Sequence, residues 1–252
     1  MNHTSVCVFE NPQELARAAA AMFTEEAERS MREKGRFAVA LAGGSTPKVL
    51  YELLAAEYRD ELDWGKVHVF FGDERCVPPD HEDSNYRMAR QALLSRVPVG
   101  SVHRMRGELT ASKAAALYEE ELVSFFGSPP GFDLILLGLG EDGHTASLFP
   151  RTPALYVCDH WVIENPVEKL GTIRITLTTP AINRARKVAF LVTGAGKAEA
   201  LREVIEGDAE PQDYPAKLIY PSGALTWMID REAADLLSDP AASRDRSRSH
   251  DK

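Results

Sequence analysis

Four apolar stretches of the chain each run directly into a short turn rich in glycine or charged residues, and this recurring pattern restricts the fold most. The stretches are residues 37–42, 67–71, 132–137 and 187–192, and the turns that follow them read GGSTP, GDER, GLGEDGH and TGAGK. A buried strand, a tight turn and a helix in succession form the repeating unit of a parallel sheet with right-handed crossovers. The sequence therefore predicts an α/β fold with a mostly parallel sheet and helices on both faces, and the four turns should meet at one rim.

The segments between these units carry further helices and strands. Residues 11–14, NPQE, offer an N-cap, a proline at the first helical position and a glutamate three residues after the cap, and Gly35 is suited to end that helix. The segment 76–85 contains two successive prolines and should be an irregular loop. We expect further helices over residues 48–56, 85–95, 110–126, 198–206 and 231–237, and further strands over residues 6–9, 102–105, 161–163, 173–178 and 224–229.

Length and composition indicate a single domain. The chain has 252 residues, of which 44% are hydrophobic, and this is enough for the core of one large α/β domain. No internal repeat or linker divides it, so we expect one domain over residues 1–240. Residues 241–252 alternate charged residues and serines, with no apolar residue beyond two alanines, and should form a disordered tail.

Charge and cysteine content disfavour several classes of function. The formal net charge of −9 argues against a nucleic acid or an anionic membrane as partner, because the summed field would repel phosphate-rich surfaces. The three cysteines include no C-x-x-C pair, so neither a disulfide framework nor a thiolate metal site is indicated. No apolar run approaches the roughly 20 residues of a membrane span, and the N-terminus has no signal-like pattern. We expect a cytoplasmic protein, and a monomer.

The loop at residues 138–144 is the strongest candidate for acid–base chemistry. Its glycines allow a tight backbone path that presents Glu141, Asp142 and His144 together. A purely structural interpretation is that Asp142 or His144 caps a helix over residues 145–149. The position of these groups outside the end of a strand favours the acid–base interpretation.

Two of the other turns suggest an anion site. The turn Gly43-Gly44-Ser45-Thr46 can direct backbone N–H groups and two hydroxyls at a phosphate-sized anion, but Ser45 or Thr46 could equally be an ordinary helix cap. Lys197 opens a helix, where the helix dipole disfavours a cation, and a bound anion would account for it.

Charged residues at a further strand end extend this set. Asp73, Glu74 and Arg75 could be a solvated ion-pair cluster, but their place at the end of a strand favours a part in the site. Arg174 lies on the polar face of the alternating segment 173–178, where it is either solvated or directed into the site. Cations for a phosphate, together with carboxylates and one imidazole for proton transfer, predict a phosphorylated small molecule as substrate.

Five motifs in this order resemble the 6-phosphogluconolactonase family. They are LAGGSTP, FFGDERCVP followed by DSNY, LGLGEDGHTASLFP, RITLTTPAIN and LVTGAGKAEAL. The resemblance implies a three-layer α/β/α sandwich, with the modified Rossmann-like sheet of the phosphosugar isomerase and deaminase type. It also implies hydrolysis of 6-phospho-D-glucono-1,5-lactone to 6-phospho-D-gluconate, in the oxidative branch of the pentose phosphate pathway, without a metal or organic cofactor.

The resemblance also assigns roles to individual residues. It implies that His144 is the general base that activates water, that Asp142 supports it, and that Arg75 reaches the substrate. Asp73 would be a hydroxyl-binding or structural carboxylate. The implied phosphate-binding residues are Gly43, Gly44, Ser45, Thr46, Arg174 and Lys197.

Two alternatives remain open at this point. Glucosamine-6-phosphate deaminases share the fold and the D-G-H core, but their motifs tend to read D-E-Y and D-G-H-I-A-F-N-E-P. This chain has Arg75 at the tyrosine position and lacks that motif's glutamate. A non-enzymatic phosphosugar sensor would usually carry a basic DNA-binding segment, which this acidic chain does not show. Residues 168–172 lack the proline-rich character of the lactonase family, which leaves the entry of Arg174 into the site open.

Overall fold

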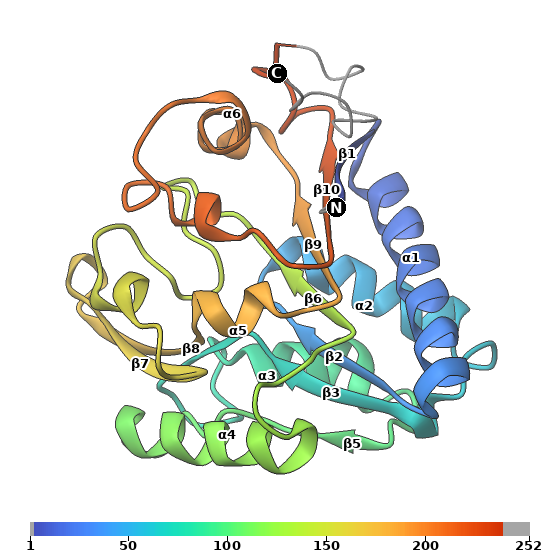
Figure 1. The fold of residues 1–252 in the computed structure, drawn as a ribbon. Coiled ribbons are helices and arrows are strands. Elements are labelled where there is room, and N and C mark those ends of the chain that lie inside the picture. The colour runs from blue at the N-terminus through green and yellow to red at the C-terminus, as the bar shows by residue number, and fades with distance from the viewer. Residues whose placement is uncertain (1–2, 239–252) are drawn as a thin grey trace.

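A seven-stranded parallel sheet forms the centre of the molecule and confirms the predicted α/β class (Figure 1). The computed structural model describes residues 3–238, so the tail predicted at residues 241–252 lies outside the described part. The strands are β1 (His3–Phe9), β2 (Phe37–Leu41), β3 (Val67–Phe71), β5 (Ser101–Val102), β6 (Leu134–Leu137), β9 (Lys187–Val192) and β10 (Ala224–Asp230). Their order is β1-β10-β9-β6-β2-β3-β5, and every neighbouring pair is parallel.

Successive residues of the central strands point to opposite faces of this sheet and enter two separate cores. In β2, for example, Val39 packs into one core and Ala40 into the other. Helices cover both faces, so the predicted three-layer α/β/α sandwich is confirmed (Figure 1). One layer contains α1 (Pro12–Lys34), α2 (Ser45–Glu57), α3 (Asn85–Ala89) and the π-helical turn η2 (Arg90–Leu94), and the other contains α4 (Ala111–Phe126), α5 (Thr179–Asn183) and α6 (Ala198–Glu206).

A second, antiparallel sheet lies beside the first and was not predicted. It consists of β4 (Asp73–Arg75), β8 (Thr172–Leu177) and β7 (Val162–Val167), in the order β4-β8-β7. Gly72 joins the two sheets, because its N–H donates to the carbonyl of Leu41 and its own carbonyl accepts from the N–H of Leu177. The segment 73–75 was expected only as the charged end of a strand. It is itself a strand because it pairs with β8, a partner far away in the chain (Asp73 pairs with Thr176) that local sequence does not reveal.

Most predicted elements are present, with differences at their ends. Asn11 caps α1 by accepting from the N–H of Glu14, and Gly35 ends this helix with φ 75°, as predicted. The helix expected over 85–95 is α-helical only to Ala89 and continues as η2, and the strand expected over 102–105 shortens to β5. The helix predicted over 231–237 is wrong: this segment forms turns, in which the Asp230 carboxylate accepts from the N–H of Ala233. Within residues 3–238, no helix combines the length and apolar character needed to cross a bilayer.

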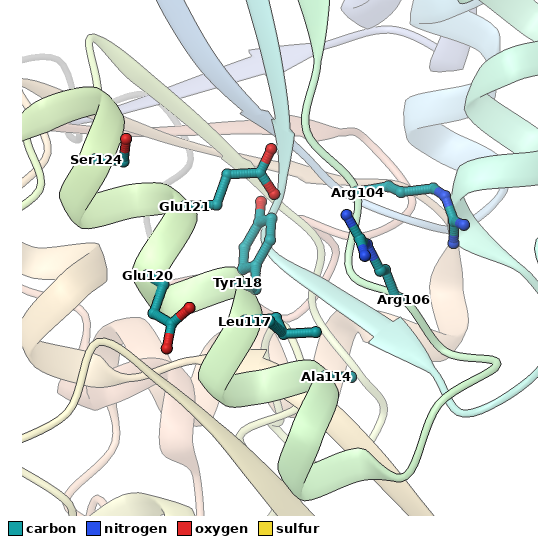
Figure 2. Close-up of a pocket in the computed structure, with 8 residues that line it drawn as sticks. All are labelled: Arg104, Arg106, Ala114, Leu117, Tyr118, Glu120, Glu121 and Ser124. Carbon is teal, nitrogen blue, oxygen red and sulfur yellow. The ribbon is translucent and has the colours of Figure 1, made fainter.

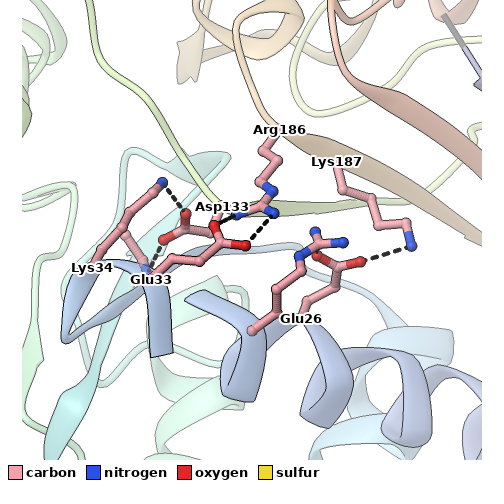
Figure 3. Close-up of polar contacts among 8 residues, drawn as sticks. Glu26, Glu33, Lys34, Asp133, Arg186 and Lys187 are labelled. Atoms are coloured by element: carbon pink, nitrogen blue, oxygen red, sulfur yellow. Dashed lines mark hydrogen bonds and ion pairs between the residues drawn. The ribbon is translucent and has the colours of Figure 1, made fainter. Parts of the chain in front are cut away.

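A network of charges joins α1 to the amino ends of β6 and β9 (Figure 3). The buried Asp133, directly before β6, accepts from the Lys34 ammonium at 2.6 Å and from the N–H of Ala38 at 2.9 Å. Nearby, the exposed carboxylate of Glu33 binds the Arg186 guanidinium. Asp133 therefore connects α1, β2 and β6 in a buried position, whereas the Glu33 pair is open to solvent.

Replacing Asp133 by alanine is expected to lower the free energy of unfolding by about 2–3 kcal/mol, because the buried N–H of Ala38 loses its acceptor. Urea unfolding followed by circular dichroism measures this change. Glu33→Ala is the matched control: it removes an exposed ion pair of the same network and should cost much less. Equal losses for the two variants would contradict the argument.

Candidate active site

A cavity of about 590 Å³ opens at the carboxyl ends of the parallel strands. It lies beside β2 and β6, where the direction of the strand order reverses, which is the usual ligand position in open α/β sheets. Four separate turns reach it, as the sequence predicted. Eight of the ten predicted site residues line it, namely Gly43, Gly44, Asp73, Arg75, Asp142, His144, Arg174 and Lys197.

Ser45 and Thr46 are the two predicted residues that do not line the cavity. Both lie in the first turn of α2, whose N-cap is Gly44 with φ 107° and no side-chain cap. The alternative that Ser45 or Thr46 caps this helix is therefore wrong. The Thr46 hydroxyl instead lies 2.6 Å from that of Thr193, a contact that holds the turn after β2 against the turn after β9.

His144 is held from two sides. Its Nδ1 lies 2.5 Å from Asp142 Oδ1, and its ring stacks on Phe149 with 4.1 Å between centroids. A side chain at Gly140 would lie about 2.0 Å from Nδ1, so only glycine allows the ring this position. Residues 145–149 form no helix, so the capping interpretation of this loop is also wrong.

The surroundings of His144 keep its imidazole neutral. Its pKa is lowered to about 4, chiefly by burial; the charge of Asp73 opposes the shift, and those of Lys197, Arg174 and Arg75 add to it. Because Asp142 accepts from Nδ1–H, the proton of the neutral ring is placed on Nδ1 and the lone pair on Nε2. The ring can therefore act as a base through Nε2 at neutral pH.

Arg75 and Arg174 lie directly opposite one another on β4 and β8. The Nε atoms of both side chains are buried and lack a hydrogen-bond partner among the described residues. Burial lowers the pKa of Arg174, and the charge of Arg75 lowers it further. Arg75 also donates to the carbonyl of Asp83 in the loop between β4 and α3. Two adjacent cations that line one cavity are well suited to bind an anion.

The carboxylates of Asp73 and Glu74 are both buried, so the solvated ion-pair interpretation is wrong for them. Asp73 accepts from Ser147 Oγ at 2.6 Å and from Asn85 Nδ2 at 3.1 Å, and it lines the cavity. Glu74 points elsewhere: it accepts from the N–H groups of Asn85 and Tyr86 and from the Ser84 hydroxyl. Glu74 therefore anchors the irregular loop, whereas Asp73 belongs to the cavity wall.

Lys197 lies in the 3-10 turn η5 (Ala195–Lys197), immediately before α6. Its side chain lines the cavity, and its ammonium is 3.8 Å from Glu141. The predicted position at the start of a helix is confirmed. The mostly exposed Glu141 carboxylate screens Lys197 only weakly, so its charge remains available to the cavity.

Several lining residues were not predicted as site residues. Lys169, in the 3-10 turn η4 (Glu168–Leu170) between β7 and β8, binds the Asp142 carboxylate. Phe149 supports His144, and Asn85 contacts Asp73. The sequence carries no signal for Lys169, because its contact depends on the hairpin formed by β7 and β8. For Phe149 and Asn85, the motifs GHTASLFP and DSNY were a usable signal.

A smaller cavity, about 270 Å³, lies against α4 and is distinct from the first (Figure 2). Side chains of α4, including Tyr118 and Glu121, line one side, and Arg104 and Arg106 line the other. Arg104 is already bound by both carboxylate oxygens of Glu108. This cavity contains no predicted site residue, so we assign the candidate site to the larger one.

Comparisons with known proteins agree with this geometry. The family model described as glucosamine-6-phosphate isomerases/6-phosphogluconolactonase matches residues 10–227. A 6-phosphogluconolactonase of Synechocystis sp. is 48% identical over 239 residues, covering 92% of this chain and 98% of that relative. The solved 6-phosphogluconolactonase of Trypanosoma cruzi is similar with a TM-score of 0.85 at 34% identity, covering 95% of this chain and 99% of the other. The chain therefore belongs to the glucosamine-6-phosphate isomerase/6-phosphogluconolactonase family.

Proposed function

We propose that this protein is a 6-phosphogluconolactonase that hydrolyses 6-phospho-D-glucono-1,5-lactone to 6-phospho-D-gluconate, in the oxidative branch of the pentose phosphate pathway. The observation that carries the proposal is the position of His144, which lies against Asp142 in a cavity that also contains Arg75, Arg174 and Lys197. A neutral base and a set of cations are what water activation beside a phosphorylated substrate requires. We propose that it acts in the cytoplasm, as a monomer.

In this proposal His144 Nε2 removes a proton from a water molecule that attacks the lactone carbonyl. Asp142 holds the Nδ1–H and stabilises the imidazolium as it forms. Arg75 stabilises the negative charge that develops on the carbonyl oxygen. The imidazolium then returns the proton to the ring oxygen as the C–O bond breaks, so the base is regenerated without any further group.

The phosphate is assigned to the other cations and to the glycine turn. Arg174 and Lys197 line the same cavity as Gly43 and Gly44. These two glycines lead into the N-terminus of α2, which has no side-chain cap. Ser45 and Thr46 would then act indirectly, by shaping this turn. Asp73 is assigned to a sugar hydroxyl or to support of Ser147.

The direct test is to add the purified protein to freshly generated 6-phosphogluconolactone and to follow 6-phosphogluconate with its dehydrogenase. Hydrolysis far above the spontaneous rate is expected. The matched comparison is glucosamine 6-phosphate, from which no ammonia should be released, because the deaminase glutamate is absent from the motif after His144. Ammonia release without lactone hydrolysis would refute the proposal in favour of a deaminase.

The pH profile of kcat/KM follows from the pKa of His144. Since this pKa is lowered to about 4, chiefly by burial, the base form persists far below neutral pH. The value of kcat/KM is therefore at its maximum above the pKa and is lost as the pH falls through it, by about tenfold for each further pH unit. We expect a level profile from pH 8 to about 5. A control incubation at each pH, assayed afterwards at pH 7, separates titration from unfolding. An acidic limb near pH 6.5 would contradict the lowered pKa of the partly buried imidazole.

A further inference from the structure

Lys169 contacts both of the groups that hold His144. Its ammonium binds Asp142 Oδ2, while Oδ1 of the same carboxylate receives His144 Nδ1. The ammonium also lies 5.2 Å from the centre of the Phe149 ring, and that ring stacks on His144. The side chain lines the cavity and is half exposed. Lys169 therefore reaches His144 through two separate neighbours.

The position of Lys169 in the chain connects these contacts to the rest of the site. It lies in the turn η4 that joins β7 to β8, and β8 carries Arg174. β8 pairs in turn with β4, which carries Asp73 and Arg75. The hairpin of β7 and β8 thus carries two cations of the site: Arg174, which lines the cavity, and Lys169, which binds the Asp142 carboxylate.

We propose that Lys169 is a positioning residue for His144. Lys169 acts by holding the Asp142 carboxylate in place and by offsetting its negative charge. This inference rests on the proposed function, in which His144 is the base. A carboxylate that accepts from Nδ1–H must be held in place to orient the ring, and Lys169 holds the other oxygen of this partly exposed loop carboxylate. Its positive charge also offsets that of Asp142, so that the carboxylate orients the imidazole without holding it in the protonated form.

The charges that face His144 come from every neighbouring element. Asp73 and Arg75 extend from β4, Arg174 from β8 and Lys197 from the turn before α6, while Asp142 belongs to the same loop. Loss of Lys169 leaves all of these charged groups in place and removes the cation that contacts Asp142 and the Phe149 ring. The negative charge of the carboxylate beside Nδ1 is then no longer offset by a nearby cation, which favours the imidazolium.

The variant Lys169→Met tests this role in the intact protein. We expect kcat to fall by about tenfold on the level part of the pH profile, with KM within about twofold, because orientation of the base is lost but substrate contacts remain. The acidic limb of kcat/KM should move to higher pH. Lys169→Arg should restore both values, since a guanidinium can bind the same carboxylate oxygen.

Lys66→Met is the matched control. Lys66 also lies in a 3-10 turn, η1 (Trp64–Lys66), and forms a similarly exposed ion pair with Asp63, at 2.8 Å. It does not line the cavity, so the variant should leave kcat, KM and the pH profile unchanged. A rise in KM of Lys169→Met with unchanged kcat would overturn the proposal, because Lys169 would then bind substrate directly. Unchanged kinetics would overturn it as well.

A measurement without substrate separates this inference from the proposed function. The His144 imidazole can be titrated by NMR in the free wild type and in Lys169→Met, and the midpoint should lie at higher pH in the variant. This shift would support the contact chain from Lys169 to His144 even in a protein that does not hydrolyse the lactone. Identical titrations in the two proteins would overturn the inference even if lactone hydrolysis is fast.

Discussion

Replacing His144 by alanine is expected to lower kcat for lactone hydrolysis by about 10²–10⁴-fold, the usual contribution of a general base. The change removes the lone pair on Nε2, while Asp142, Arg75 and the rest of the cavity wall remain. KM should change little, because the phosphate is assigned to other residues. Initial rates at saturating substrate, corrected for spontaneous hydrolysis, measure the effect.

His160→Ala is the control for a general effect of losing a histidine. The His160 side chain is 58% exposed and contacts Glu119 of α4, and it does not line the cavity. This variant should keep the wild-type kcat. If His144→Ala retained activity within tenfold of wild type, the base would have to be another group, and Asp73 would be the next candidate. Glu74 would not, because its carboxylate is occupied by the anchoring of the loop before α3.

The parallel sheet could be predicted from sequence because its central strands are largely buried on both faces. Such strands are mostly apolar runs, and in β2, β3 and β9 the runs end at glycine turns that mark their limits. The same reasoning predicted the site, since the carboxyl ends of parallel strands lie at one edge. The sequence therefore predicted that His144 and Lys197 lie at the same edge of the sheet, although they are 53 positions apart in the chain.

The antiparallel sheet could not be predicted in the same way. Its strand β4 contains only Asp73, Glu74 and Arg75, which show no apolar pattern, and it forms through pairing with a distant segment. The contact of Lys169 with Asp142 depends on that sheet and was missed for the same reason. The helix predicted over 231–237 failed differently: Ala233, Ala234 and Leu237 are buried as helical spacing suggests, but the segment forms turns around Asp230.

Replacing Arg174 by methionine is expected to lower kcat/KM for the phosphorylated lactone by about 10–100-fold, mainly through KM. The estimate follows from about 1.5–3 kcal/mol for a hydrogen bond to a charged group. Methionine keeps an unbranched apolar stem of similar length but carries no charge. The half-buried position of Arg174 in the cavity should make the loss larger than at an exposed site. Steady-state rates over a range of substrate concentrations separate KM from kcat.

Glucono-1,5-lactone, which has no phosphate, distinguishes the roles of the two opposed arginines. If Arg174 binds the phosphate, wild type and Arg174→Met should hydrolyse this lactone equally slowly. A substrate without a phosphate cannot form the contact with Arg174 in either protein. Arg75→Met should be impaired with both substrates, since an oxyanion forms at the carbonyl in either case. The two residues lie directly opposite one another in the pairing of β4 with β8 and line the same cavity, so they serve as controls for one another. The opposite pattern, with Arg174 needed for both substrates and Arg75 only for the phosphorylated one, would exchange their roles and place the phosphate on β4.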